Sequence, residues 1–229
     1  MNAIFSNINT LATTEPNKLA LTFIGPDGSV QESLTYSQLK AATLRLAQGL
    51  KCELNVAPGD RVALVFRPSL EFIKVFLACW ANEAITVPIK YPSNEEEILR
   101  TQRIIEDCTP KCVVGSSGPY HELNTTRIAD DPTLAFPLVK ETSTALIQYT
   151  SGSTGHPKGV VISHQNIRSN HDLISGILRR STSIPVETIV SWLPHFHDMG
   201  LIGNYLLGLR FGWTGHYMAP ETFLTNPES

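Results

Sequence analysis

The sequence predicts an α/β fold in which helices pack on mostly parallel sheets. Short apolar runs rich in β-branched residues alternate with segments whose apolar residues recur at helical spacing. Alternation of this kind is typical of parallel sheets covered by helices. The chain has 229 residues, of which 42% are hydrophobic and 17% charged. This is enough for one large or two small domains with a buried core.

The first elements predicted are two strands and a helix. We expect strands at residues 19–24 and 30–34, joined through a Gly-Pro-Asp-Gly turn. Thr35 and Gln38 have the spacing of a capping box, which marks the start of a helix. The apolar residues on one face of that helix are Leu39, Ala42, Leu46 and Leu50.

Three further strands are expected at residues 61–66, 84–89 and 111–115. The helix between the first two carries an apolar stripe that indicates core packing and not a ligand site. The stripe comprises Phe72, Val75, Phe76 and Cys79. Ser93 and Glu96 have capping-box spacing, so we expect a second helix start there, with the neighbouring glutamates forming a solvated helix end.

The second half of the chain predicts an irregular connection over residues 118–144, a strand at 160–163 and a helix after it. That helix carries Ile167, Ile174, Ile177 and Leu178 at helical spacing. A Ser-Thr-Ser-Ile-Pro segment at 181–185 suggests a hinge. We therefore expect a first α/β subdomain over residues 1–183, and the start of a second over 184–229.

The loop from Thr150 to Gly159 is the strongest candidate for a binding site. Its backbone can form a nest of N–H groups for anionic oxygens, and its lysine adds a positive charge. The predicted phosphate-binding residues are Thr150, Ser151, Gly152, Ser153, Thr154, Gly155 and Lys158. The pattern fits neither a Walker loop nor a G-x-G-x-x-G dinucleotide loop. A surface hairpin without a ligand remains the alternative.

This loop, with its Pro-Lys-Gly ending, resembles the phosphate-binding signature of adenylate-forming enzymes, the superfamily of acyl-CoA synthetases, peptide-synthetase adenylation domains and luciferases. Three segments at residues 34–39, 58–64 and 84–88 resemble that superfamily's N-terminal landmarks, in the same order. The segment Ser191–Gly203, with its His-Asp-Met-Gly-Leu run, looks most like fatty acyl-AMP ligases. By resemblance, His197 matches the family histidine at the junction of acyl group and α-phosphate.

The resemblance implies an α/β partial N-terminal domain of an enzyme that uses ATP and Mg²⁺. Such an enzyme activates a fatty acid to an acyl-adenylate, releases pyrophosphate and passes the acyl group to an acyl carrier protein. Later family motifs are not found, and the final residues read as a cut, so we expect this chain alone to be inactive. The alternatives are a fragment of an acyl-CoA synthetase or adenylation module, or a non-catalytic remnant that binds a nucleotide or a partner.

Two other interpretations concern His195, His197 and Asp198. Histidine and carboxylate together can bind zinc or iron, but this spacing does not match a binuclear hydrolase, so no metal ligand is assigned. Asp198 is placed to be the N-cap of a helix running from Met199 to Leu209.

The charge, the hydrophobic pattern and the cysteine content limit which partners and which compartment we expect for this chain. The net charge of −3 and the absence of a basic cluster argue against nucleic acid. No apolar run approaches the ~18 residues of a spanning helix, so no integral membrane contact is expected. The N-terminus has no signal-peptide pattern. The four cysteines lack zinc-site spacing, and we expect them to be reduced thiols in the cytoplasm.

Overall fold

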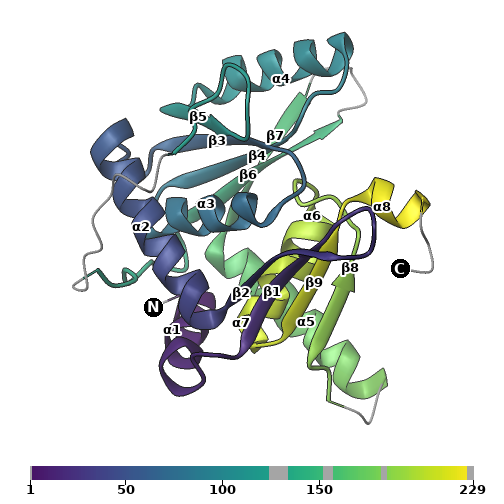
Figure 1. The fold of residues 1–229 in the computed structure, drawn as a ribbon. Helices are drawn as coiled ribbons and strands as arrows, with labels where there is room; N and C mark the ends of the chain where they lie inside the picture. The colour runs from purple at the N-terminus through teal and green to yellow at the C-terminus, as the bar shows by residue number, and fades with distance from the viewer. Residues whose placement is uncertain (1, 124–133, 152–156, 182–184, 226–229) are drawn as a thin grey trace. The chain divides into compact units, whose positions relative to one another are not determined.

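The computed structural model describes residues 2–123, 134–151, 157–181 and 185–225 (Figure 1). They form two compact units, each with its own sheet. The terminal unit comprises Met1–Ala42, Pro68–Leu70 and His164–Ser229, and the central unit comprises Thr43–Arg67 and Glu71–Ser163. The predicted α/β class is confirmed.

The central unit is built on a five-stranded sheet in the order β5-β3-β4-β6-β7. Its strands are β3 (Arg61–Phe66), β4 (Ile85–Lys90), β5 (Cys112–Gly115), β6 (Thr144–Ser151) and β7 (Pro157–Ser163). The first four run parallel, and β7 is antiparallel to β6. The strands predicted from residues 61–66, 84–89 and 111–115 are confirmed to within a residue.

Helices α3 (Leu70–Ala81) and α4 (Glu95–Cys108) cover opposite faces of this sheet (Figure 1). Alternate residues of a strand point to opposite faces, which divides the core in two. Ala63 and Val65 of β3 belong to a buried cluster that includes Ile104 of α4. On the other face, Phe66 packs edge-on against Phe72 with ring centroids 6.1 Å apart. The apolar stripe of α3 is core, as expected.

The terminal unit contains a four-stranded sheet in the order β2-β1-β9-β8. Its strands are β1 (Leu19–Ile24), β2 (Val30–Thr35), β8 (Thr188–Ser191) and β9 (Thr214–Met218). β1 is antiparallel to β2 and parallel to β9, and β8 is parallel to β9. The helical elements of this unit include α1 (Ala3–Thr14), α5 (His164–Ser181), α6 (Asp198–Gly200), the π-helix η2 (Leu201–Leu206), α7 (Leu207–Phe211) and α8 (Pro220–Thr225).

The two units are not consecutive pieces of the chain, so they do not coincide with the division expected after residue 183. β1 pairs directly with β9, which brings the first strand of the chain beside the last. Thr214 reinforces this pairing by donating its hydroxyl to the carbonyl of Leu19 at 2.9 Å. The predicted hinge includes residues 182–184, which lie outside the described residues.

The capping predictions have different outcomes. The first box is confirmed at the start of α2 (Tyr36–Leu54): the amide of Thr35 donates to Gln38 Oε1 at 2.8 Å, and the amide of Gln38 donates to the Thr35 hydroxyl at 3.2 Å. The second, placed on Ser93 and Glu96, is wrong by one residue, because Asn94 is the N-cap of α4.

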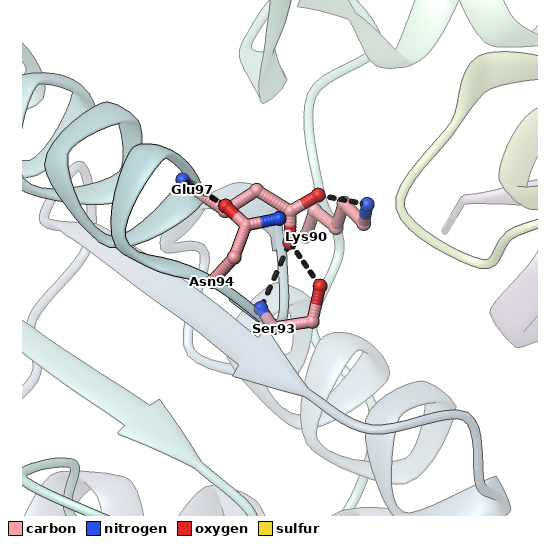
Figure 2. A network of polar contacts seen from close by, with 4 residues as sticks. All are labelled: Lys90, Ser93, Asn94 and Glu97. Carbon is pink, nitrogen blue, oxygen red and sulfur yellow. Dashed lines mark hydrogen bonds and ion pairs between the residues drawn. The ribbon is translucent and has the colours of Figure 1, made fainter.

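Figure 2 shows the polar contacts at this second helix start. Asn94 accepts the amide N–H of Glu97 at 2.9 Å, and Glu97 reaches back to the amide and hydroxyl of Ser93, both at 2.8 Å. Lys90 also binds the Glu97 carboxylate, and this contact is the largest cause of a lowered pKa for Glu97, about 2. Three partners therefore hold Glu97 as part of the helix start.

Within the described residues, no helix is both long and apolar enough to cross a membrane.

Candidate active site

The predicted phosphate loop begins and ends on a β-hairpin of the central unit. In the β6–β7 register, Tyr149 is opposite Gly159, Thr150 is opposite Lys158 and Ser151 is opposite Pro157. Thr150 and Lys158, both exposed, are therefore side by side at the end of the hairpin next to its connecting loop, which we call the loop end. Gly152, Ser153, Thr154 and Gly155 lie outside the described residues. The strand expected at 160–163 begins earlier, at Pro157.

Tyr149, one residue before Thr150, ties the hairpin to a helix near its loop end. Its hydroxyl donates to the carboxylate of Asp107 in α4. Burial, followed by this donation to a carboxylate, raises the pKa of Tyr149 above its usual range. A β-carbon on Gly159 would lie 2.8 Å from Ile147 Cγ2 and 3.1 Å from Tyr149 Cζ. The glycine that ends the Pro-Lys-Gly run thus makes room for two side chains of the neighbouring strand.

The loop end of the hairpin lies where the strands of the sheet have their carboxyl ends, which is where ligands bind in α/β folds. β6 runs parallel to β4, and β3 runs parallel to β4 and β5, so all four strands end at the same edge. In open parallel sheets, the carboxyl ends of the strands are the usual location of a binding site. Ser151, the last residue of β6, is at this edge. The topology thus agrees with a ligand at the predicted loop.

The second predicted element, around His197, belongs to the terminal unit. A tight turn precedes α6: the amide of Leu193 donates to the Ser191 hydroxyl at 3.2 Å, and the amide of His197 donates to the carbonyl of Pro194 at 3.0 Å. His197 is the N-cap, and Asp198 is the first helical residue, so the predicted cap on Asp198 is displaced by one position. Asp198 nevertheless accepts the amide of Met199 at 2.8 Å.

His197 and Asp198 form an exposed pair. The His197 Nδ1 atom is 2.6 Å from Asp198 Oδ1, and both side chains are 59% exposed. Nδ1 also lies 3.4 Å from the amide of Met199. It cannot donate and accept at once, and the shorter contact assigns its proton to the Asp198 bond. In the neutral ring, Nε2 is then the nitrogen that carries a lone pair.

Gly200 explains why the turn and the helix fit together. A β-carbon at this position would lie 2.2 Å from the carbonyl oxygen of Pro194 and 2.9 Å from that of Leu193. Both obstacles are backbone atoms, which cannot rotate away as a side chain can. The Met-Gly step after His197-Asp198 is therefore a packing requirement in this structure, whatever its role in a ligand site.

The sequence predicted a helix from Met199 to Leu209. In the structure, the helical run from Asp198 to Phe211 is not a regular α-helix. Its middle, Leu201–Leu206, is a π-helix. Two carbonyls in this region accept bonds from side chains: Asn204 Nδ2 donates to Met199 at 2.6 Å, and His171 Nε2 contacts the carbonyl of Ile202 at 2.9 Å. Such π turns are rare and occur frequently at functional sites.

Three residues that support these elements were not predicted from the sequence: Asp107, His171 and Asn204. His171 had a signal that was available. It lies on the same helical stripe as Ile167 and Ile174, a position where a buried polar residue is predicted to need a partner. Asp107 and Asn204 had no such signal, because their partners are distant in sequence or are backbone atoms.

Among the described residues, no group of three or more His, Cys, Asp or Glu side chains is arranged to hold a metal ion. His195 is 3% exposed whereas His197 is exposed, so these two imidazoles lie in different environments. Mg²⁺ is usually held by one or two carboxylates together with substrate phosphates. The described residues do not by themselves form a site for it.

Comparison with known proteins identifies the family of this chain. A sequence profile described as "AMP-binding enzyme" matches residues 9–229. The chain belongs to the AMP-binding enzyme family. A curated member, the long-chain-fatty-acid–AMP ligase FadD28 of Mycobacterium tuberculosis, is 31% identical over 96% of this chain and 42% of its own length. The putative fatty-acid–CoA ligase FadD21 of the same species is 28% identical, with 99% of this chain and 43% of the relative covered.

Solved structures of AMP-binding enzymes show the same fold. The fatty acid AMP ligase from Legionella pneumophila superposes with a TM-score of 0.86 and 33% identity, over 99% of this chain and 41% of that one. A second structure from that organism is described as a complex of fatty acyl-adenylate ligase with acyl adenylate and pyrophosphate, and it matches equally well. This chain therefore spans less than half the length of each of these four relatives.

Proposed function

We propose that this chain contributes the ATP-phosphate site and part of the acyl site of a fatty acid–AMP ligase. The observation that carries the proposal is the pairing of Thr150 with Lys158 at the loop end of the β6–β7 hairpin. A hydroxyl donor and an ammonium group face the same exposed end, on the ligand-binding edge of the sheet. The relatives named as fatty-acid–AMP ligases support a fatty acid and ATP as the substrates.

In the proposed reaction, a carboxylate oxygen of the fatty acid attacks the α-phosphorus of ATP. The bond from the α-phosphorus to the bridging oxygen breaks, and its electron pair leaves with pyrophosphate. Catalysis of phosphoryl and nucleotidyl transfer is mostly positioning and charge stabilisation. Lys158 would neutralise charge that grows on the departing phosphates, while Thr150 and the other loop donors hold their oxygens. Mg²⁺, when bound with the nucleotide, would further polarise the phosphates.

His197 has a positioning role in this proposal. Its Nδ1–H bond to Asp198 fixes the ring orientation and presents Nε2 on the opposite side of the imidazole. That nitrogen would contact the fatty-acid carboxylate or the α-phosphate as they approach each other. Support for this role comes from the exposure of the pair and from the resemblance of the motif to fatty acyl-AMP ligases.

For the second half-reaction, we propose an acyl carrier protein as the acceptor. The resemblance of His197–Leu201 to acyl-AMP ligases favours it. Coenzyme A is the alternative acceptor, because one relative is named as a putative fatty-acid–CoA ligase. The free thiols of the four cysteines agree with a cytoplasmic location, which we also propose.

A pyrophosphate-release assay tests the first half-reaction. The full-length protein, given ATP, Mg²⁺ and a long-chain fatty acid, is expected to release pyrophosphate, while the 229-residue chain by itself is not. Mass spectrometry of the same mixture should show the acyl-adenylate. If the full-length protein forms no adenylate with any chain length of fatty acid, the proposed substrate class is wrong.

Lys158→Ala tests the phosphate contact. Removing one preorganised charge-stabilising donor costs about 10²–10³ in rate, so we expect a loss of that size in pyrophosphate release, with fatty-acid binding retained. Lys111→Ala is the matched control: Lys111 is exposed and precedes β5, so it lies at the opposite edge of the sheet. An equal loss in both variants would contradict the assignment of Lys158.

A further inference from the structure

His171 is a buried titratable residue that the proposed reaction does not use. It lies in α5 with 0% exposure, and its Nε2 is 2.9 Å from the carbonyl oxygen of Ile202, inside the π-helix. A carbonyl can only accept, so Nε2 must carry the proton. Nδ1 is then a bare acceptor, buried and without a hydrogen-bond partner among the described residues. The imidazole is thus committed to a single donation.

The carbonyl that His171 binds lies in a part of the helix whose ladder differs from the α-helix. A π turn joins residues five apart in place of four, and the ladder must change spacing where it begins. Side-chain donors supply bonds at two places in this region. His171 binds the carbonyl of Ile202, and Asn204 binds the carbonyl of Met199, just before the π turn.

A second contact joins α5 to the helical run at α7, beyond the π turn. Arg210, in α7, donates to the carbonyl of Arg168 at 2.8 Å and to the Asp172 carboxylate at 2.6 Å. Residues 168, 171 and 172 share one face of α5, because residues three and four apart are neighbours on a helix. This face therefore binds the run at Ile202, within the π turn, and again at Arg210, beyond it.

We propose that His171 is a positioning residue that fixes the π turn and thereby the direction in which His197 and Asp198 project. The extra residue of a π turn rotates everything before it relative to everything after it. α7 is tied to α5 by Arg210, so the rotation falls on the N-terminal end of the run, where His197 and Asp198 lie. This inference rests on the proposed function for the importance of His197, but not for the geometry of the turn.

The first test is spectroscopic and uses the wild-type protein. Nitrogen-15 spectra of the imidazoles should show His171 as the neutral Nε2–H form, with a proton that exchanges slowly with solvent because it is buried and bonded. The Nδ1–H form would place two lone pairs face to face at Ile202 and would overturn the inference.

The second test compares His171→Gln with His171→Met by hydrogen exchange and mass spectrometry. Glutamine can present an amide N–H near the original Nε2, whereas methionine has a similar size and no donor. We expect amides of residues 198–207 to exchange about tenfold faster in the methionine variant and near the wild-type rate in the glutamine variant. Asn204→Ala removes the exposed donor and should raise exchange in the same segment without disturbing the core. Unchanged exchange in the methionine and alanine variants would refute the role.

Turnover by the full-length protein then connects the turn to the reaction. His171→Met should lower the rate of adenylate formation about tenfold, leave the KM for ATP unchanged and be rescued by glutamine. A wild-type enzyme that forms no adenylate, but shows the expected exchange pattern, would refute the proposed function and leave the assignment of the turn intact. Normal turnover by the methionine variant despite faster exchange would show that the turn does not position His197.

Discussion

The β6–β7 hairpin of the central unit and the helical run after His197 in the terminal unit each carry one predicted motif, and they are stabilised in opposite ways. In the hairpin, backbone pairing between Thr150 and Lys158 holds the chain, and both side chains remain exposed. In the helical run, side chains hold the backbone: His171 and Asn204 bind carbonyls at and before the π turn. The exposed pair His197–Asp198 depends on that support.

This difference separates the residues that can be exchanged from those that cannot. A side chain presented by a strand ladder can change without loss of the ladder, so substitutions at Lys158 should affect function alone. The helix that begins after His197 packs against the turn at Leu193 and Pro194 and is bound by the buried His171. Substitutions there should therefore change both stability and function. Four predictions test this contrast, in order of decreasing effect on stability.

Mild acid should destabilise the terminal unit before the central unit. Burial lowers the pKa of His164 and His171 to about 4, against 6.5 for an ordinary histidine. The unfolded chain therefore binds more protons below pH 6.5, and stability falls from there towards pH 4. The loss at pH 5 is on the order of 2 kcal/mol per histidine.

Hydrogen exchange at pH 7 and pH 5, corrected for intrinsic rates, measures this effect. Protection should decrease in α1 and α5, where Asn2 Nδ2 donates to Nδ1 of His164 at 2.8 Å. Peptides from β3 and β4 are the internal control. Equal losses in both units would contradict the prediction.

Gly200→Ala should cost about 3 kcal/mol, at the upper end for overpacking, because the new methyl group would meet the backbone carbonyl of Pro194. Chemical unfolding followed by tryptophan fluorescence would measure the loss. A variant as stable as the wild type would show that the turn before α6 can move, and that the packing of Gly200 against Pro194 is not rigid.

Gly159→Ala should cost less, about 1 kcal/mol, because the methyl group meets side-chain atoms of Ile147 and Tyr149 and no backbone carbonyl. The same unfolding experiment applies. If this hairpin variant proves less stable than Gly200→Ala, the proposed order of rigidity between the two regions is reversed.

Gly203→Ala should have the smallest effect and the opposite sign. Apart from its chain neighbours and the backbone of its own helix, no heavy atom lies within 4 Å of the position a β-carbon would take. Replacing a helical glycine by alanine typically stabilises by about 0.5–1 kcal/mol. An increase in the unfolding midpoint is therefore expected. A marked loss would mean that the π turn itself requires glycine.

The sequence allowed most strands to be placed, because apolar runs such as residues 61–66 are buried on both faces and have no competing interpretation. It also allowed the first capping box to be placed. The second was displaced because Ser93 and Asn94 are both good caps, and in the structure Asn94 takes this role while Lys90 and Ser93 bind Glu97. The division after residue 183 differed from the compact units because the pairing of β1 with β9 leaves no local trace.

For the candidate site, the loop residues and His197 stay predictions from composition and family resemblance, and the π turn was not predicted at all. Its helical run has ordinary apolar spacing, and the donors that define it come from α5 and from Asn204. Interactions between segments distant in sequence decide such details, and local patterns do not record them.

The pairing of β1 with β9 has a consequence for the order in which the protein is made. Leu19 and Thr214 are bonded across 195 residues, and the whole central unit lies between them in the chain. At about 5–20 residues per second, a ribosome needs roughly 10–40 s to synthesise that interval. During this time β1 and β2 wait as an incomplete sheet with an open edge, while residues 43–163 can already collapse. The β1–β2 segment is thus the part of the nascent chain that we expect chaperones to bind.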